Sequence, residues 1–275
     1  MAGLILVDVQ YDFLPGGALA VKEADTIITP ILDELLPPAS ASSSSQQPWR
    51  TIVATQDYHP VGHISFASSH TGAKPLDTRR VSHPLIKGEE IDQVMWPDHC
   101  VQGTRGAEIE DHVAARLRQI KTSEREAPDI ILVQKGTDPH VDGYSGLSDN
   151  AQSRFTPLVR YLSSRRPDPI DVVVVCGLAT DYCVLYTAMD LVKFGYKVLL
   201  PREATRGVDA QGSQEALDKL EAAGVKVVQT AREAKELARQ MVKQLEARSE
   251  ESYLGKFELE QKKVWEEQMG RQSVQ

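Results

Sequence analysis

The chain has 275 residues, a formal net charge of −8 and a pI near 5.4. Its 41% hydrophobic and 25% charged residues are ordinary for a folded globular protein, and they exclude a collagen-like or wholly disordered chain. The acidic balance argues against nucleic acid as a partner, and no apolar run reaches the roughly 18 residues that a membrane-spanning helix needs. Three cysteines are too few for a disulfide framework, which predicts a reducing compartment, the cytoplasm or also the nucleus.

Six short runs of valine, isoleucine and leucine predict buried parallel strands. They lie at Leu4–Val7, Thr51–Ala54, Ile130–Val133, Val172–Val175, Val198–Leu200 and Val225–Val228. Stretches with helical period lie between most of them, at Ala24–Leu36, Ala107–Ile120, Phe155–Leu162, Asp181–Phe194 and Gln214–Ala222. This alternation predicts an α/β fold, in which a parallel sheet is covered on both faces and ligands bind beyond the carboxyl ends of the strands.

Three segments interrupt the alternation. Pro37–Pro48 is rich in serine, proline and glutamine, which predicts a surface insertion, and Ser68–Met95 has no clear period, which favours a lid. From Ala231 onward the chain is charged and predicts one or two amphipathic helices that pack on the body or on a second subunit. Their apolar positions are Leu237, Met241, Leu245, Tyr253, Leu254, Phe257, Val264 and Trp265. We therefore predict a domain over residues 1–230, with the insertion at about 37–48, and a helical extension over 231–275.

Three predicted strands end in side chains that can carry chemistry. Asp8 closes the first run, Lys135 follows the third, and Cys183 follows the fourth. An acid or a lysine at a strand end is usually just solvated, and a lone cysteine is more often part of a core than a nucleophile. The sequence around Cys183, however, favours a nucleophile over a core residue.

Cys183 falls in the first turn of a predicted helix that follows directly on a strand. Gly177 permits a tight turn, and Thr180 or Asp181 can cap the helix. Such a strand–turn–helix elbow presents a nucleophile, and both the helix N-terminus and a nearby Lys135 ammonium would lower the pKa of the thiol. By contrast, Cys100 and Cys176 have no such context and are predicted to be structural.

A second cluster follows the second predicted strand, where Asp57 and His59 stand two residues apart. In an extended chain both side chains leave the same face, and a carboxylate with an imidazole can hold a divalent metal, for which Zn is the natural choice. A hydrogen-bonded aspartate and histidine at a strand end is the alternative. Spacing alone does not select a third ligand among His63, His70, His83 and His99.

Five segments in this order resemble the nicotinamidase branch of the isochorismatase-like cysteine hydrolases, and more closely its fungal members. They are LILVDVQYDFLPGGALAV, ATQDYHPVGHISF, WPDHCVQGT, VQKGTDPHVDGYSGL and VCGLATDYCVLYTAMDLVKFGYKV, and the similarity covers roughly residues 3–229. The resemblance implies a Rossmann-like three-layer sandwich with a mainly parallel six-stranded sheet. It also implies an amidase that converts nicotinamide to nicotinate and ammonia for NAD salvage, and that accepts pyrazinamide.

The resemblance also implies roles for individual residues. Asp8 matches the acid/base of the family, Lys135 its lysine and Cys183 its nucleophile, which forms a thioester. The oxyanion hole matches the backbone N–H groups of Ala179 and Cys183, with a cis peptide bond before Ala179. The metal ligands match Asp57, His59 and His99, and the metal binds the ring nitrogen of the substrate; the ring pocket matches Phe13, Trp96 and Tyr182.

Two alternatives remain open at this point. A related hydrolase of the same fold could act on another small amide, a carbamoyl compound or a vinyl ether, although Cys183 and the Asp57–His59 pair weigh against the last. An inactive relative could only bind a ligand while its C-terminal helices recruit a partner, but no matched motif residue is lost. A homo-oligomer is compatible with either.

Overall fold

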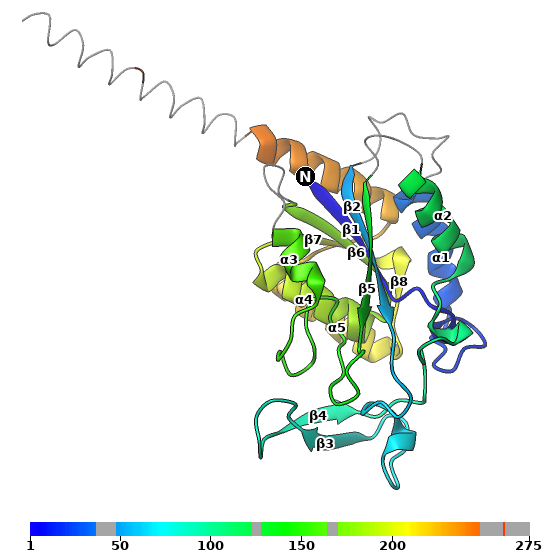
Figure 1. Cartoon of the computed structure of the whole chain (residues 1–275). Coiled ribbons are helices and arrows are strands. Elements are labelled where there is room, and N and C mark those ends of the chain that lie inside the picture. The colour runs from blue at the N-terminus through cyan, green and yellow to red at the C-terminus, as the bar shows by residue number, and fades with distance from the viewer. Residues whose placement is uncertain (37–47, 123–127, 164–169, 248–260, 262–275) are drawn as a thin grey trace, which may run out of the picture.

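The computed structural model of the chain describes residues 1–36, 48–122, 128–163, 170–247 and 261 (Figure 1). The predicted insertion, apart from residue 48, and the predicted apolar positions beyond residue 247 lie outside these ranges. Within them, no helix is both long and apolar enough to cross a membrane.

A parallel sheet forms the centre of the molecule, in the order β5-β2-β1-β6-β7-β9. Its strands are β1 (Ala2–Val7), β2 (Trp49–Asp57), β5 (Asp129–Lys135), β6 (Val172–Leu178), β7 (Lys197–Pro201) and β9 (Lys226–Val228). All six predicted strands are therefore confirmed. A seventh strand, β8 (Thr205–Arg206), pairs with the end of β6, and the sequence did not predict it because two residues show no period.

Successive residues of the central strands face two separate apolar cores. In β1, Leu4 and Leu6 join one core, while Ile5 and Val7 join the other. In β6, the valines alternate between the same two cores. Such continuous apolar runs are typical of a sheet that helices cover on both faces, and the molecule is a three-layer sandwich as expected.

The helices divide between the two faces of the sheet (Figure 1). On one face lie α1 (Ile28–Pro30), η3 (Ile31–Leu35), α2 (Asp111–Thr122) and a helix over residues 231–247. On the other lie α3 (Pro157–Ser163), α4 (Leu185–Lys193) and α5 (Ala210–Ala222). Each occupies a region that the helical period predicted. The first region is not one regular helix, because the 3₁₀ turn η2 (Ala24–Ile27) precedes α1 and Pro30 lacks the amide that an α-helical hydrogen bond requires.

The predicted irregular segment at 68–95 contains a β-hairpin. Strands β3 (Thr78–Ser82) and β4 (Glu90–Val94) pair antiparallel, apart from the main sheet. Half of their ten residues are exposed and four are charged, so the sequence carries no apolar alternation and predicted no strand here. Its function as a moving lid stays a prediction.

The helix over residues 231–247 packs against the body of the molecule. Ala231, Ala234 and Ala238 are completely buried in the core on that face, and Leu237 and Met241 lie against the same core. This part of the predicted extension therefore belongs to the main fold. The boundary at residue 230 stays a prediction.

Candidate active site

Cys183 lies just beyond the carboxyl end of strand β6. It belongs to a single π-helical turn, η8 (Thr180–Val184), which leads directly into α4, and its residue is only 6% exposed. The peptide bond between Leu178 and Ala179, just before this turn, is cis. The predicted strand–turn–helix geometry is therefore present at the cysteine.

Two details of that prediction are wrong. Gly177 lies inside strand β6, where a Cβ atom would stand 2.0 Å from the carbonyl oxygen of Val7, so this glycine permits close contact with β1 and makes no turn. The helix cap is Ala179, with no side-chain hydrogen bond. Thr180 pairs with the hydroxyl of Thr205, and Asp181 accepts from backbone N–H groups at the start of α5, because the fold brings that segment alongside.

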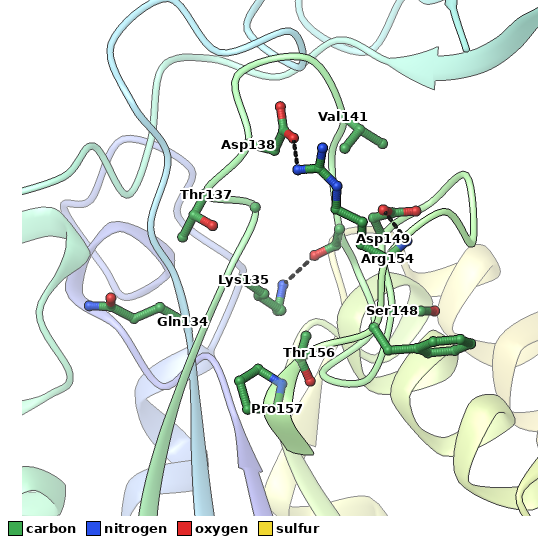
Figure 2. Close-up of a pocket in the computed structure, with 13 residues that line it drawn as sticks. Gln134, Lys135, Thr137, Asp138, Val141, Ser148, Asp149, Arg154, Thr156 and Pro157 are labelled. Atoms are coloured by element: carbon green, nitrogen blue, oxygen red, sulfur yellow. Dashed lines mark hydrogen bonds and ion pairs between the residues drawn. The ribbon is translucent and has the colours of Figure 1, made fainter. Parts of the chain in front are cut away.

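Lys135 ends strand β5 and connects the candidate catalytic residues. Its Nζ lies 3.1 Å from the sulfur of Cys183 and 3.0 Å from a carboxylate oxygen of Asp8. It also lies 2.6 Å from Asp57, and it donates to the carbonyl of Gly143 over 3.0 Å (Figure 2). Burial opposes the charge of this ammonium, but Asp57 and Asp8 outweigh it and raise the pKa of Lys135 well above its usual value. The lysine is therefore a fixed cation.

Asp8 directly follows strand β1 and is completely buried, with a backbone φ of 48°. Its Oδ1 accepts a hydrogen bond from the hydroxyl of Thr55 over 2.6 Å, and its Oδ2 faces Lys135. Burial, only partly offset by the ammonium of Lys135, raises the pKa of Asp8 to about 6. A carboxyl group with this pKa can exchange protons near neutral pH.

The structure contradicts the predicted lowering of the cysteine pKa. Burial raises the pKa of Cys183 well above the usual value, and Lys135 lowers it only in part, while Asp8 and Asp57 raise it further. The lysine does not compensate for the loss of water around the sulfur. Cys183 therefore rests as a thiol and needs a neighbouring base to become a nucleophile.

Asp57, His59 and His99 form a buried cluster at the carboxyl end of β2. The Nε2 atoms of His59 and His99 lie 3.7 and 3.9 Å from Oδ2 of Asp57. Three side-chain atoms converge in this way on one point, so the cluster can hold a divalent metal ion. Of the four histidines that the spacing left open, His99 is the one that joins Asp57 and His59 in this set.

The hydrogen bonds of both histidines suit metal binding. Nδ1 of His59 lies 2.9 Å from the carbonyl of Gly136, and Nδ1 of His99 lies 2.7 Å from the carbonyl of Pro97. A carbonyl only accepts, so each Nδ1 carries the proton and each Nε2 presents its lone pair to the cluster. Gly136 is required here, because a Cβ atom at this residue would lie 2.3 Å from the ring of His59.

His63 is also completely buried and stacks on His59 at 4.2 Å. Its Nδ1 is hydrogen-bonded to the hydroxyl of Ser65 over 2.7 Å, so it supports the cluster from one side. With His59 and Asp142 it makes a second group that could hold a metal. Of the remaining histidines, the ring of His70 binds the carbonyl of Ile64, and His112 is largely exposed.

The buried charges around the cluster of Asp57, His59 and His99 also indicate whether it suits a divalent cation. Two buried carboxylates, those of Asp8 and Asp57, share one buried ammonium, that of Lys135, and a third buried carboxylate, that of Asp142, lies beside His59 and His63. A divalent cation would balance the excess negative charge, and unbalanced buried charge is costly. The donor set and the charge therefore both fit a divalent metal.

Aromatic side chains line the cavity that these groups face. Trp96 and Tyr182 meet edge to face at 4.8 Å between ring centroids, and Phe13 lies beside the ring of His99 at 5.6 Å. The cavity also contains Asp57, His59, His99, Ala179 and Cys183 among its lining residues. Every site residue predicted from the sequence therefore lines this cavity or, for Asp8 and Lys135, lies in the contact network just behind Cys183.

Sequence reasoning missed four residues of the cavity wall, Leu19, Asp142, Tyr144 and Val208. The hydroxyl of Tyr144 accepts a hydrogen bond from the indole N–H of Trp96 over 3.2 Å. Asp142 accepts from the amide of Gln93 over 3.0 Å, which ties the cavity wall to strand β4. Asp142 and Tyr144 do lie in the VDGYSG part of one of the five segments that resemble the family. The sequence therefore pointed to this region, but it assigned no role to either residue.

A different cavity, of about 200 Å³, lies where residues 134–143 face residues 148–157 (Figure 2). The ion pair between Arg154 and Asp138, 2.6 Å long, stands at its wall. Although Lys135 borders it, this cavity shares no lining residue with the aromatic cavity. Cys183 and the cluster of Asp57, His59 and His99 thus belong to the aromatic cavity.

Three comparisons with known proteins agree with this geometry. The family model described as the isochorismatase domain matches residues 147–232. The nicotinamidase of Acinetobacter baylyi is 39% identical over 81% of this chain and 89% of its own length. Among solved structures, yeast nicotinamidase bound to the inhibitor nicotinaldehyde has a TM-score of 0.72 and 30% identity, covering 84% of this chain and 100% of that one. A pyrazinamidase of Pyrococcus horikoshii in complex with zinc has a TM-score of 0.58 and 33% identity, covering 83% and 98%.

The sheet, the helical layers and the cysteine at the end of β6 define a hydrolase with the isochorismatase-like α/β fold. At 39% identity over most of both chains, the chain belongs to the nicotinamidase family. The bacterial relative is more similar in sequence than the yeast one, and the predicted closeness to fungal members stays a prediction.

Proposed function

We propose that this protein hydrolyses nicotinamide to nicotinate and ammonia through a thioester on Cys183, and that it serves NAD salvage. One observation carries the proposal: Cys183, Lys135 and Asp8 form a contact network directly beside the Asp57, His59 and His99 cluster, at one aromatic cavity. The relatives named nicotinamidase support the choice of substrate. Ammonia release from nicotinamide by the purified protein is the direct test.

The resting protonation states dictate the first step. The thiol of Cys183 carries its proton, and Asp8, with a pKa of about 6, is largely ionised at neutral pH. Asp8 takes the thiol proton as the sulfur attacks the carboxamide carbon, and Lys135 stabilises the thiolate over its 3.1 Å contact. A carbon–sulfur bond forms, and the carbonyl oxygen becomes an oxyanion.

The same aspartate then completes the reaction. Asp8 passes its proton to the leaving nitrogen as the carbon–nitrogen bond breaks, so that ammonia departs and the thioester remains. It next removes a proton from water, which attacks the thioester, and it returns that proton to the sulfur as nicotinate leaves. We assign the backbone N–H groups of Ala179 and Cys183 to the oxyanion, which is supported by the position of both residues at the cavity wall.

Asp57, His59 and His99 would hold the metal, which would bind the pyridine nitrogen and so fix the ring relative to the sulfur. One carboxylate and two imidazoles suit Zn, and the zinc in the Pyrococcus horikoshii relative favours the same metal here. Phe13, Trp96 and Tyr182 would enclose the ring with their apolar faces.

Loss of a metal ligand is expected to empty the site. At equal free-metal concentration, the metal bound per chain should be at least about tenfold lower in His99→Gln than in the unaltered protein, because the substitution removes one of three protein donors. Metal content after dialysis, measured by elemental analysis, checks this. His112→Gln is the matched control, because His112 is largely exposed, pairs with Glu110 and lies outside the metal-binding cluster. Equal metal content in the two variants would contradict the assignment.

The rate should depend on the ionisation of Asp8. Its pKa is raised to about 6, so below that pH the carboxyl is protonated and cannot accept the thiol proton. We expect kcat/KM for nicotinamide to fall about tenfold per pH unit below about pH 6 and to level off above it. A profile measured from pH 4.5 to 8 checks this, with circular dichroism showing that the fold persists. A rate that stays constant down to pH 5 would exclude Asp8 as the base.

Pyrazinamide should be a second substrate. Its ring has one more nitrogen than nicotinamide, and its size and its carboxamide are otherwise the same, so the same cavity and the same nucleophile apply. We expect ammonia release from pyrazinamide with kcat within about tenfold of nicotinamide, because an uncharged, near-isosteric change costs about 1 kcal/mol or less. Turnover of nicotinamide without any turnover of pyrazinamide would refute the ring-binding scheme.

We place the protein in the cytoplasm, with the nucleus as a second compartment. The support is that all three cysteines are free and buried, which suits a reducing environment. A homo-oligomer stays a prediction.

A further inference from the structure

A separate cavity of about 410 Å³ lies beside the active site. It is formed by residues 22–23, by β8 with the preceding 3₁₀ turn η9 (Arg202–Ala204), and by the first turns of α5. It shares Val208 with the wall of the active-site cavity, and Thr180, which begins the turn that carries Cys183, also lines it. The two cavities are therefore neighbours with different linings.

Three cations converge on this cavity, although the whole chain carries a net charge of −8. They are Lys22, Arg202 and Arg206, and the cavity lining contains one acid, Glu23. Clustered cations in an acidic protein concentrate a positive potential where an anion can reach it.

None of the three cations has a carboxylate partner among the residues that the structure describes. Arg202 donates only to the side-chain amide of Gln214, over 3.2 Å. Arg206 donates through Nη1 to backbone carbonyls, the nearest being that of Thr205 at 2.7 Å. Within the same described ranges, Lys22 has no hydrogen bond or ion pair. Their charges are thus available to a ligand.

The nearby acids are engaged elsewhere. Asp181 accepts hydrogen bonds from the backbone N–H groups of Val208 and Asp209, both at 3.0 Å. Asp209 caps α5 by accepting from the N–H of Gly212 over 2.6 Å. Both carboxylates therefore fix the start of α5 and leave the cations unpaired.

We propose that this cavity binds a phosphorylated small molecule. Guanidinium groups match phosphate oxygens in pairs, and Lys22 adds a point charge from the opposite segment. The volume lies in the range of small-molecule pockets, roughly 300–1,000 Å³, so it holds more than a phosphate group. Ser213 and Glu23 supply oxygen acceptors for hydroxyl groups on the rest of the molecule.

Calorimetric titration of the full chain with glucose 6-phosphate tests the proposal, with glucose at the same concentration and ionic strength as the uncharged reference. We expect saturable binding of one glucose 6-phosphate per chain and none of glucose. Arg202→Gln and Lys22→Gln should each weaken the affinity about tenfold, because each removes one charge-assisted contact. Inorganic phosphate should bind more weakly than the sugar phosphate, since it fills less of the cavity.

Arg160→Gln on α3 is the matched control, because it removes an exposed guanidinium outside this cavity. It should bind glucose 6-phosphate as the unaltered protein does. The proposal is overturned if the unaltered protein shows no saturable binding, if glucose binds equally well, or if Arg160→Gln weakens binding as much as Arg202→Gln. Binding is measured without turnover, so the outcome is independent of the amidase activity.

Discussion

Cys183→Ala is expected to abolish the hydrolysis of nicotinamide, with kcat/KM reduced by at least about 10⁴-fold, as for other enzymes that lose their nucleophile. The reason is that no other thiol reaches the cavity: Cys100 and Cys176 are buried in the apolar core. Ammonia release, measured continuously at saturating nicotinamide, gives the reduction. Binding of nicotinate to the variant shows that its cavity is intact.

Cys176→Ala is the matched control, because it removes a buried cysteine from strand β6, and its side chain lies in the apolar core on the face of the sheet opposite Cys183. Burial raises the pKa of Cys176, and its thiol donates a hydrogen bond to the carbonyl of Ile5 over 3.8 Å. This variant should lose some stability and keep its kcat. If Cys183→Ala kept more than a hundredth of the activity, covalent catalysis by this residue would be excluded.

Among the variants proposed for this protein, Lys135→Met is expected to lower the free energy of unfolding most. It should also remove the activity. The substitution keeps the volume but leaves Asp8 and Asp57 buried without their common cation. Breaking a buried ion pair on one side typically costs about 3–5 kcal/mol in the free energy of unfolding, and kcat should fall by at least about 10³-fold. Urea unfolding at pH 7.5 measures the first quantity, and ammonia release the second.

Lys193→Met serves as its control. Lys193 pairs with Asp190 over 2.9 Å, but its side chain is 56% exposed, so its loss should cost less than about 1 kcal/mol. Similar unfolding free energies for the two variants would show that the buried cation is not essential to the fold. Full activity in Lys135→Met would remove the lysine from the mechanism.

The sequence predicted the sheet well because each of its strands is a continuous apolar run, which can be detected without knowing the strands that pair with it. It failed where structure depends on distant pairing. Strand β8 has two residues and exists only because it adds to the end of β6, and the β3–β4 hairpin is stabilised by pairing of strands in which half of the residues are exposed. No local pattern reports such pairings.

At the candidate site, residue types and strand ends were enough to single out Asp8, Lys135 and Cys183 as groups that could meet. Their protonation states were not predictable, because the pKa of Cys183 depends on its burial and on two carboxylates from other strands. Similarly, spacing left the partner of Asp57 and His59 open, since His99 reaches them only after the chain has passed through the hairpin.

The most direct test of the proposed mechanism is to quench the enzyme with acid during steady turnover of nicotinamide and to weigh its peptides by mass spectrometry. The account predicts that the peptide containing Cys183 gains the mass of one nicotinoyl group, that alkaline hydroxylamine removes it, and that Cys183→Ala lacks it. Unmodified Cys183 under conditions that trap a known thioester enzyme, while ammonia is still being released, would contradict the account.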